Sequence, residues 1–340
     1  MSHRHELVAQ PRVVIRREVS GVVNPDSIRW LRMPQAELLF TVIIPAFNKP
    51  DGLRTCLEAL QRQTLPSSRF EIIVVDDGSE PSLEPVVKAF DSLLPITYIR
   101  VQNAGPAAAR NHGARLAKGR YLAFTDHDCA PSPGWLAALS EGCRLKPDRM
   151  LGGPKQNGLP DNLYSAAHQL ASNFAEDWFR RSNGAAYFTT NNLTVPREAF
   201  LGSGGFNESF SFAQEDREFG ARWRDAGFVM EWVPDAVVVH LHKLSLRTFM
   251  RQQFLYGTGA GDFHAARSEA PVRSGTRFEG LRFHFGLVLA PFSRSRDVRS
   301  PLLAALLVAS QMAYLAGVLM RPRGSRRAFP ALKRSQPADQ

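Results

Sequence analysis

Short apolar runs alternate with amphipathic stretches from residue 39 to about residue 125. The apolar runs have the length and composition of buried strands, and the stretches between them show helical spacing. We expect strands at Phe40–Ile44, Phe70–Val75, Ile96–Val101 and Tyr121–Thr125, and helices after Asp51, over Leu83–Phe90 and over Gly105–Lys118. Asp51 is expected to cap the first helix. Strands and helices alternating at such short intervals predict an α/β fold with a mostly parallel sheet covered by helices on both faces.

Polar clusters follow three of the expected strands. They are Pro45–Asn48, Asp76–Ser79 and Asp126–Asp128. In a parallel sheet, ligands bind in the crevice at the carboxyl ends of the strands. We therefore expect these three loops to converge on one binding site.

Asp126 and Asp128 are two carboxylates one residue apart at the end of a strand. Strand alternation points their side chains the same way, so that they can hold one hard cation together. Mg²⁺ and Mn²⁺ favour such oxygen ligands and complete their shells with water and substrate phosphates. The alternative is a solvated turn in which Asp128 caps a helix.

Two further segments suit a nucleotide. Asp76 and Asp77 can accept hydrogen bonds from a base or ribose, although an ordinary capped turn has the same composition. The helix expected from Gly105 would offer free N–H groups to phosphate, and Arg110 lies one turn into it, within reach of a diphosphate. The alternative is a tightly packed helix with a surface arginine. The first strand is not followed by G-x-G-x-x-G, which disfavours a dinucleotide site.

The ordered series of motifs resembles a family 2 glycosyltransferase with a GT-A type, Rossmann-like fold, from about Phe40 to about His242. The resemblance implies a nucleotide-diphospho-sugar donor, a divalent metal (Mg²⁺ or Mn²⁺) and inversion at the anomeric carbon. Asp128 would be the principal metal ligand, with Asp126 contacting ribose or metal-bound water. Nucleotide-sugar-binding residues would be Pro45, Phe47, Asn48, Asp76, Asp77, Arg110, Asn111 and Asp126.

The later part of the resemblance supplies the catalytic carboxylates. Glu215 and Asp216 stand where the family carries its base, and the preceding residue, usually glycine, is Gln214. We expect Asp216 to deprotonate the acceptor hydroxyl, which typically contributes ~10²–10⁴-fold in rate, and Glu215 to orient substrate. A solvated helix start is the alternative. His240, or His242 in its place, would complete the metal shell, although a histidine at a strand end is often structural.

Charge divides the chain. Residues 247–340 hold 15 Lys and Arg against 5 Asp and Glu, whereas residues 1–246 hold 27 of each. A neutral core argues against nucleic-acid binding, and a basic appendage favours an anionic partner. The three cysteines suit a reducing compartment, and residues 1–17 lack the apolar stretch of a signal peptide.

We expect an extension at 1–38 with a short strand near Val13–Ile15, a glycosyltransferase domain at 39–245 and a basic helical region at 246–340. Its apolar segment 300–320 is long enough to span a bilayer. Arginines bracket it on both sides, so a surface-lying or re-entrant helix, a span and a helix packed on the protein all remain open. The predicted place is the cytoplasmic face of the membrane.

The predicted function is inverting transfer of a sugar to a hydroxyl of a glycan or lipid-linked acceptor, in the synthesis of a cell-surface polysaccharide or glycolipid. The alternative is a non-catalytic nucleotide-sugar-binding partner of a glycan assembly complex.

Overall fold

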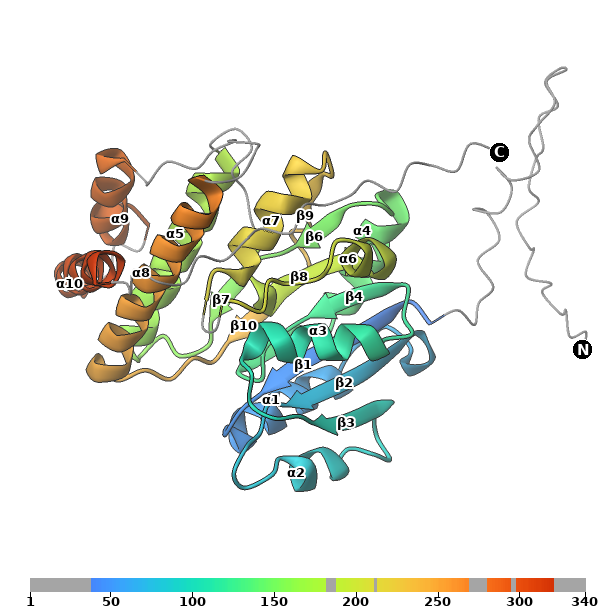
Figure 1. Cartoon of the computed structure of the whole chain (residues 1–340). Helices are drawn as coiled ribbons and strands as arrows, with labels where there is room; N and C mark the ends of the chain where they lie inside the picture. The colour runs from blue at the N-terminus through green and yellow to red at the C-terminus, as the bar shows by residue number, and fades with distance from the viewer. Residues whose placement is uncertain (1–37, 182–187, 211–212, 269–279, 295–297, 321–340) are drawn as a thin grey trace, which may run out of the picture. The chain divides into compact units, whose positions relative to one another are not determined.

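The computed structural model describes residues 38–181, 188–210, 213–268, 280–294 and 298–320 (Figure 1). The strand expected near Val13–Ile15, the charged residues 1–17 and the basic residues beyond 320 lie outside these ranges.

A seven-stranded sheet forms the centre, in the order β3-β2-β1-β4-β8-β6-β9. Its members are β1 (Phe40–Ala46), β2 (Phe70–Asp76), β3 (Ile96–Arg100), β4 (Tyr121–Phe124), β6 (Met150–Gly152), β8 (Leu193–Pro196) and β9 (Met230–Trp232). The four strands predicted from the apolar runs pair in parallel, and β8 runs antiparallel to both β4 and β6. The predicted mostly parallel α/β sheet is confirmed.

Strand alternation divides the core into two apolar layers. Val42 and Ile44 face the layer that contains α1 (Pro50–Gln61), α2 (Glu84–Lys88) and α4 (Trp135–Leu145). Ile43 faces the other layer, with α3 (Pro106–Leu116), α6 (Arg197–Gly202) and α7 (Glu215–Asp225). A Cβ on Gly113 of α3 would lie 2.8 Å from Ile43 Cγ2, so this helix packs on the sheet more closely than a larger residue allows.

A second, three-stranded sheet joins β5 (Cys129–Pro131), β10 (Val238–His240) and β7 (Lys155–Asn157). β10 is antiparallel to β5 and places His240 opposite Cys129. The N–H of Leu241 donates to the carbonyl of Asp128 at 2.8 Å. The small sheet therefore brings the residues after β4 and the distant segment around His240 side by side.

Four longer helices complete the molecule: α5 (Leu163–Arg181), α8 (Leu246–Ser268), α9 (Leu281–Arg294) and α10 (Ser300–Leu319). α10 packs against α8, α9 and α5. An added Cβ on Gly257 of α8 would collide with the backbone of Tyr314, and one on Gly317 of α10 with the backbone of Phe254. In Figure 1 these helices lie together on the left, beside the ends of the strands of the central sheet.

α10 is the one described helix that is long and apolar enough to cross a membrane, with mean hydropathy 2.0. This criterion concerns length and composition alone. Only 22% of its most apolar window is buried within the chain.

One local prediction was wrong. Asp51 does not cap α1, because Pro50 takes the first helical position and leaves Lys49 as the capping residue, without a side-chain hydrogen bond. The strand around His240 ends at that residue and belongs to the small sheet.

Candidate active site

A cavity of about 710 Å³ lies between the carboxyl ends of the parallel strands and the helices α5, α8, α9 and α10. The strand side contributes Pro45, Phe47, Asp77, Asp126, Asp128, His240 and His242, the start of α7 contributes Gln214, Glu215 and Asp216, and the helical side includes His168, Gln253, Tyr256, Phe283, His284, Leu287, Gln311 and Tyr314. The predicted convergence of the three polar loops is therefore seen in Pro45, Asp77 and Asp126–Asp128.

Asp128 and His240 form the part of the cavity best suited to a cation. His240 Nε2 lies 3.6 Å from Asp128 Oδ2, and His240 Nδ1 lies 3.1 Å from Gln169 Oε1 of α5. A hydrogen bond at Nδ1 fixes the ring so that Nε2 points to the carboxylate. Burial opposes ionisation of Asp128, yet the adjacent imidazoles, above all His240, hold the pKa of its carboxyl well below the usual range. An ionised carboxylate beside an oriented imidazole is a donor set that fits a divalent metal.

Two more imidazoles extend this group. Donor atoms of His168, His240 and His242 lie within 4.8 Å of one another. Burial lowers the pKa of His242 to about 4 and that of His168 well below its ordinary value. Both rings are therefore neutral near pH 7, the form that binds metals. Nδ1 of each is buried and has no hydrogen-bond partner among the described residues.

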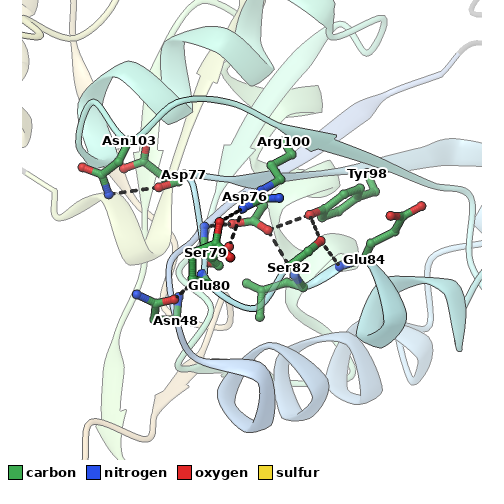
Figure 2. A network of polar contacts seen from close by, with 11 residues as sticks. Asn48, Asp76, Asp77, Ser79, Glu80, Ser82, Glu84, Tyr98, Arg100 and Asn103 are labelled. Atoms are coloured by element: carbon green, nitrogen blue, oxygen red, sulfur yellow. Dashed lines mark hydrogen bonds and ion pairs between the residues drawn. The ribbon is translucent and has the colours of Figure 1, made fainter.

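The two acidic residues after β2 have different surroundings (Figure 2). Asp76 is fully buried and accepts hydrogen bonds from the backbone of Ser79 and Leu83 and from the Tyr98 hydroxyl at 2.6 Å. These bonds shape the loop, and the side chain does not line the cavity. Burial alone would raise its pKa, but the hydrogen bonds prevail and lower it.

Asp77 lines the cavity and caps the approach to α3. Its two carboxylate oxygens accept from the N–H groups of Ala104 and Gly105, each at 2.9 Å. The N–H of Gly105, at the start of α3, is therefore already bound to a carboxylate. Asn103 donates from its side chain to the Asp77 carbonyl, as Figure 2 shows.

Arg110 is buried and joins the two acidic groups of the site. Its Nη2 donates to Asp126 Oδ1 at 2.6 Å, and its Nη1 donates to Glu215 Oε1 at 2.9 Å. The alternative of a surface arginine is excluded, since the side chain is only 4% exposed. One guanidinium thus holds the strand-end carboxylate and the start of α7 at a set separation.

Glu215 and Asp216 are the first residues of α7. Burial, followed by the charge of Asp216, raises the pKa of Glu215 to about 7. Burial also raises the pKa of Asp216, against the opposing effect of the N–H of Arg217, which donates to it at 2.7 Å. Two acidic groups with elevated pKa values in a cavity are typical of general acid–base chemistry.

The backbone conformation at Gln214 explains why glycine is the usual residue at this position in the family. Its φ is +81°, in the left-handed region where a side chain is strained. Asn48 is the other described residue with a side chain at positive φ, and asparagine tolerates it better.

Besides Asp76, two further predicted nucleotide contacts, Asn48 and Asn111, do not line the cavity. The Asn48 side-chain oxygen accepts from the N–H of Glu80 at 2.9 Å, which ties two loops together. Asn111 is buried on α3, and its amide bonds the backbone of Phe206 and the carboxylate of Glu208. These contacts give both residues a role in shaping the chain around the site.

The sequence did not predict that the helical side contributes residues to the cavity. His168 and Gln169 of α5 and Tyr256 of α8 stand in segments without a motif. Their partners are distant in sequence, since Gln169 meets a residue 71 positions away. The one signal in the sequence was the polar pair His168 and Gln169 on the inward face of a long helix.

The profile described as "Glycosyl transferase family 2" matches residues 41–201, and that of "Glycosyl transferase family group 2" matches residues 160–328. The chain is a member of the family 2 glycosyltransferases. The second match covers the helical side of the cavity as well, from α5 through α10.

Relatives of this family 2 member include large enzymes. Chondroitin synthase of Escherichia coli is 28% identical over 245 residues, covering 61% of this chain and 36% of the relative. Validoxylamine A glucosyltransferase of Streptomyces hygroscopicus subsp. limoneus is 29% identical over 266 residues, covering 67% and 59%. The chain thus spans about one third to three fifths of the length of these two relatives.

Among solved structures, the mannosyltransferase PcManGT from Pyrobaculum calidifontis, in complex with GDP-Man and Mn²⁺, is similar to this family 2 member with a TM-score of 0.55. The two share 20% identity, and the similarity covers 85% of this chain and 81% of that one. The likeness establishes the GT-A fold.

Proposed function

We propose that the chain transfers a sugar, with inversion, from a nucleotide-diphospho-sugar to a hydroxyl of a glycan or lipid-linked acceptor. One observation carries this proposal. A single cavity joins Asp77, the pair Asp128 and His240, and the buried Glu215 with its half-buried neighbour Asp216. Donor binding, metal binding and proton removal thus have candidate groups within one space, in a chain of the family 2 glycosyltransferases.

The nucleoside is proposed to lie at the ends of β1 and β2, against Pro45, Phe47 and Asp77. Phe47 is 43% exposed at the cavity and offers a face for a base to stack on. Asp76 and Asn48 would act through the loop that they hold together, and Asn111 through the 206–208 segment that it binds.

Asp128 and His240 would hold Mg²⁺ or Mn²⁺, with His242 and His168 beside them and Asp126 contacting ribose or metal-bound water. When bound, the ion would supply positive charge to the leaving diphosphate, worth several kcal/mol. The chain's own part is to keep Asp128 ionised and to orient His240 through Gln169.

Asp216 is the proposed base, and Glu215 the residue that orients substrate. Both carboxylates line the cavity, and that of Glu215 also accepts a hydrogen bond from Arg110. One base suffices for this reaction, because the diphosphate leaves without needing a proton. The elevated pKa of Asp216 makes its carboxylate a stronger proton acceptor than a solvated one.

The chain is proposed to consist of a glycosyltransferase domain at 39–245 and a helical region at 246–340. The acceptor is proposed to meet the helical region. The inner surfaces of α8, α9 and α10 face the same cavity as Asp216. An acceptor made beside a membrane would place the protein at its cytoplasmic face, where nucleotide sugars are available.

The test is release of nucleoside diphosphate from a panel of nucleotide sugars, with Mn²⁺, with Mg²⁺ and with chelator. Asp216→Asn should lose ~10²–10⁴-fold in turnover and keep donor affinity, measured by calorimetry. Glu198→Gln, on the surface, is the control. Donor binding without release from any member of the panel, unaffected by Asp216→Asn, would instead favour the non-catalytic binding partner.

A further inference from the structure

α9 presents an apolar outer face. Leu281, Phe285 and Leu289 are 76%, 67% and 58% exposed, and Phe292 is 50% exposed. Their spacing of three and four residues places them on one side of the helix. Such a stripe is more than scattered surface hydrophobicity, which needs no explanation.

α10 presents a second stripe of the same kind. Val308, Met312, Leu315 and Leu319 are 45%, 68%, 50% and 81% exposed and again follow helical spacing. The helix contains no Asp, Glu, Lys or Arg from Ser300 to Leu319. The mean hydropathy of 2.0 therefore belongs to a helix whose outer side is open to solvent.

The opposite sides of both helices are already engaged. His284 Nδ1 lies 2.8 Å from Gln311 Oε1, and Phe283 and Leu287 pack in one cluster with Leu307. Gln311 also lines the cavity. α10 has close backbone contact with α8, where a Cβ on Gly317 would collide with Phe254. Each helix thus has one face committed to the protein and one without a described partner.

The positive charge of the C-terminal part favours an anionic partner for these faces. The whole net charge of +10 arises between residues 247 and 340, and residues 321–334, directly after α10, carry six Lys and Arg and no Asp or Glu. Apolar helix faces next to basic segments fit an anionic lipid surface, where each basic residue near the surface adds about 1 kcal/mol.

The packing of α10 favours an orientation in the membrane plane. A spanning α10 would carry the cavity residue Gln311 and the attached α8 into hydrocarbon. It would also put one of the two basic flanks on the far side of the membrane, against the positive-inside rule. A helix lying in the plane avoids both costs.

We propose that the outer faces of α9 and α10 bind an anionic bilayer surface, with α10 lying in its plane. The same two helices then contact lipid on one side and line the cavity on the other. Binding of lipid by these faces does not depend on the transfer reaction.

The experiment measures binding of the purified full chain to phosphatidylcholine vesicles with and without phosphatidylglycerol. The wild type should bind the anionic vesicles more tightly. Phe285→Glu with Leu289→Glu, and separately Met312→Glu with Leu315→Glu, should each weaken binding about tenfold or more. The matched control is Leu93→Glu with Leu145→Glu, since these residues are 52% and 58% exposed in the sheet domain. It should bind as the wild type does.

Unchanged thermal unfolding midpoints would show that the variants fold. Vesicle binding that survives both helix pairs would overturn the proposal, as would a wild type that forms a dimer through these faces and ignores vesicles. Membranes of expressing cells distinguish the orientation: alkaline carbonate should release the chain, and retention in the pellet would overturn the in-plane placement.

Discussion

The two sides of the cavity are built in different ways. On the strand side, the functional residues follow the ends of strands. Asp77 after β2 and Asp126 and Asp128 after β4 come near one another because β2 and β4 both pair in parallel with β1, one on each side of it. On the helical side, His168 and Gln169 come from the middle of α5 and Tyr256 from α8. Local sequence therefore reveals the first side, while long-range packing alone assembles the second.

The comparison also concerns function. The strand side carries groups suited to a donor and metal, and the helical side offers apolar and neutral polar groups, among them Phe283, Leu287 and Gln311. Under the proposed function, the strand side would hold the donor and the metal, and the helical side would meet the acceptor. The following predictions test how far the two sides depend on each other.

The largest effect is expected at Asp128. Asp128→Ala should lower turnover about a thousandfold, because several kcal/mol of charge stabilisation are lost with the metal. The measurement is nucleoside diphosphate release at saturating Mn²⁺, alongside Mn²⁺ binding followed by electron paramagnetic resonance. His127→Ala, next in sequence, is the control. Full turnover in Asp128→Ala would refute the metal site.

Gln169 tests whether the helical side supports the strand side. Gln169→Ala removes the hydrogen bond at His240 Nδ1, so Mn²⁺ affinity should fall about 10–100-fold, with activity recovering at high Mn²⁺. Asn173→Ala, which removes the neighbouring amide bonded to Gln169, should have a much smaller effect. Equal Mn²⁺ affinity of Gln169→Ala and the wild type would mean that the strand side builds the metal site alone.

Glu215 sets a pH dependence. Its folded pKa of about 7 lies above the ordinary value of 4.5, so the neutral form is favoured on folding. This group's contribution to stability is therefore present at low pH and is lost as pH rises from about 4.5 through about 7. Glu215→Gln should flatten the unfolding midpoint across that window, measured by calorimetry, whereas Glu198→Gln should leave the profile unchanged. An identical slope in Glu215→Gln and the wild type would contradict this assignment.

The smallest effect is expected at Gln214. Gln214→Gly relieves the left-handed backbone at φ +81° and should stabilise the fold by about 1 kcal/mol or less, since glycine also loses more entropy on folding. Gln252→Gly, inside α8, should destabilise by a similar amount and serves as the opposite control. A lower urea midpoint in Gln214→Gly would show that the Gln214 side chain contributes more than its backbone strain costs.

Much of the fold was predictable because its signals are local. The runs that became β1 to β4 are apolar over a strand's length, and the helices between them have spaced apolar faces, so the sheet core follows from burial. The surroundings that each side chain faces could not be predicted from neighbouring residues alone. Asp76 and Asp77 are adjacent, yet Asp76 points into the loop and Asp77 towards the cavity, because strand alternation sends neighbours apart. The 79–83 loop supplies two donors to Asp76, and the Tyr98 hydroxyl of β3 supplies a third.

The α/β order, the family, the polar strand ends and the uneven charge could be read from the residues alone, because each is a property of short segments or of composition. The folded chain was needed to show that Arg110 joins Asp126 to Glu215, that β10 sets His240 beside Asp128, and that Gln169 of α5 orients His240. These contacts depend on register and packing between residues as far apart in sequence as Asp128 and His240, a separation of 112. Such pairings are selected by the whole core and leave no periodic trace in any one segment.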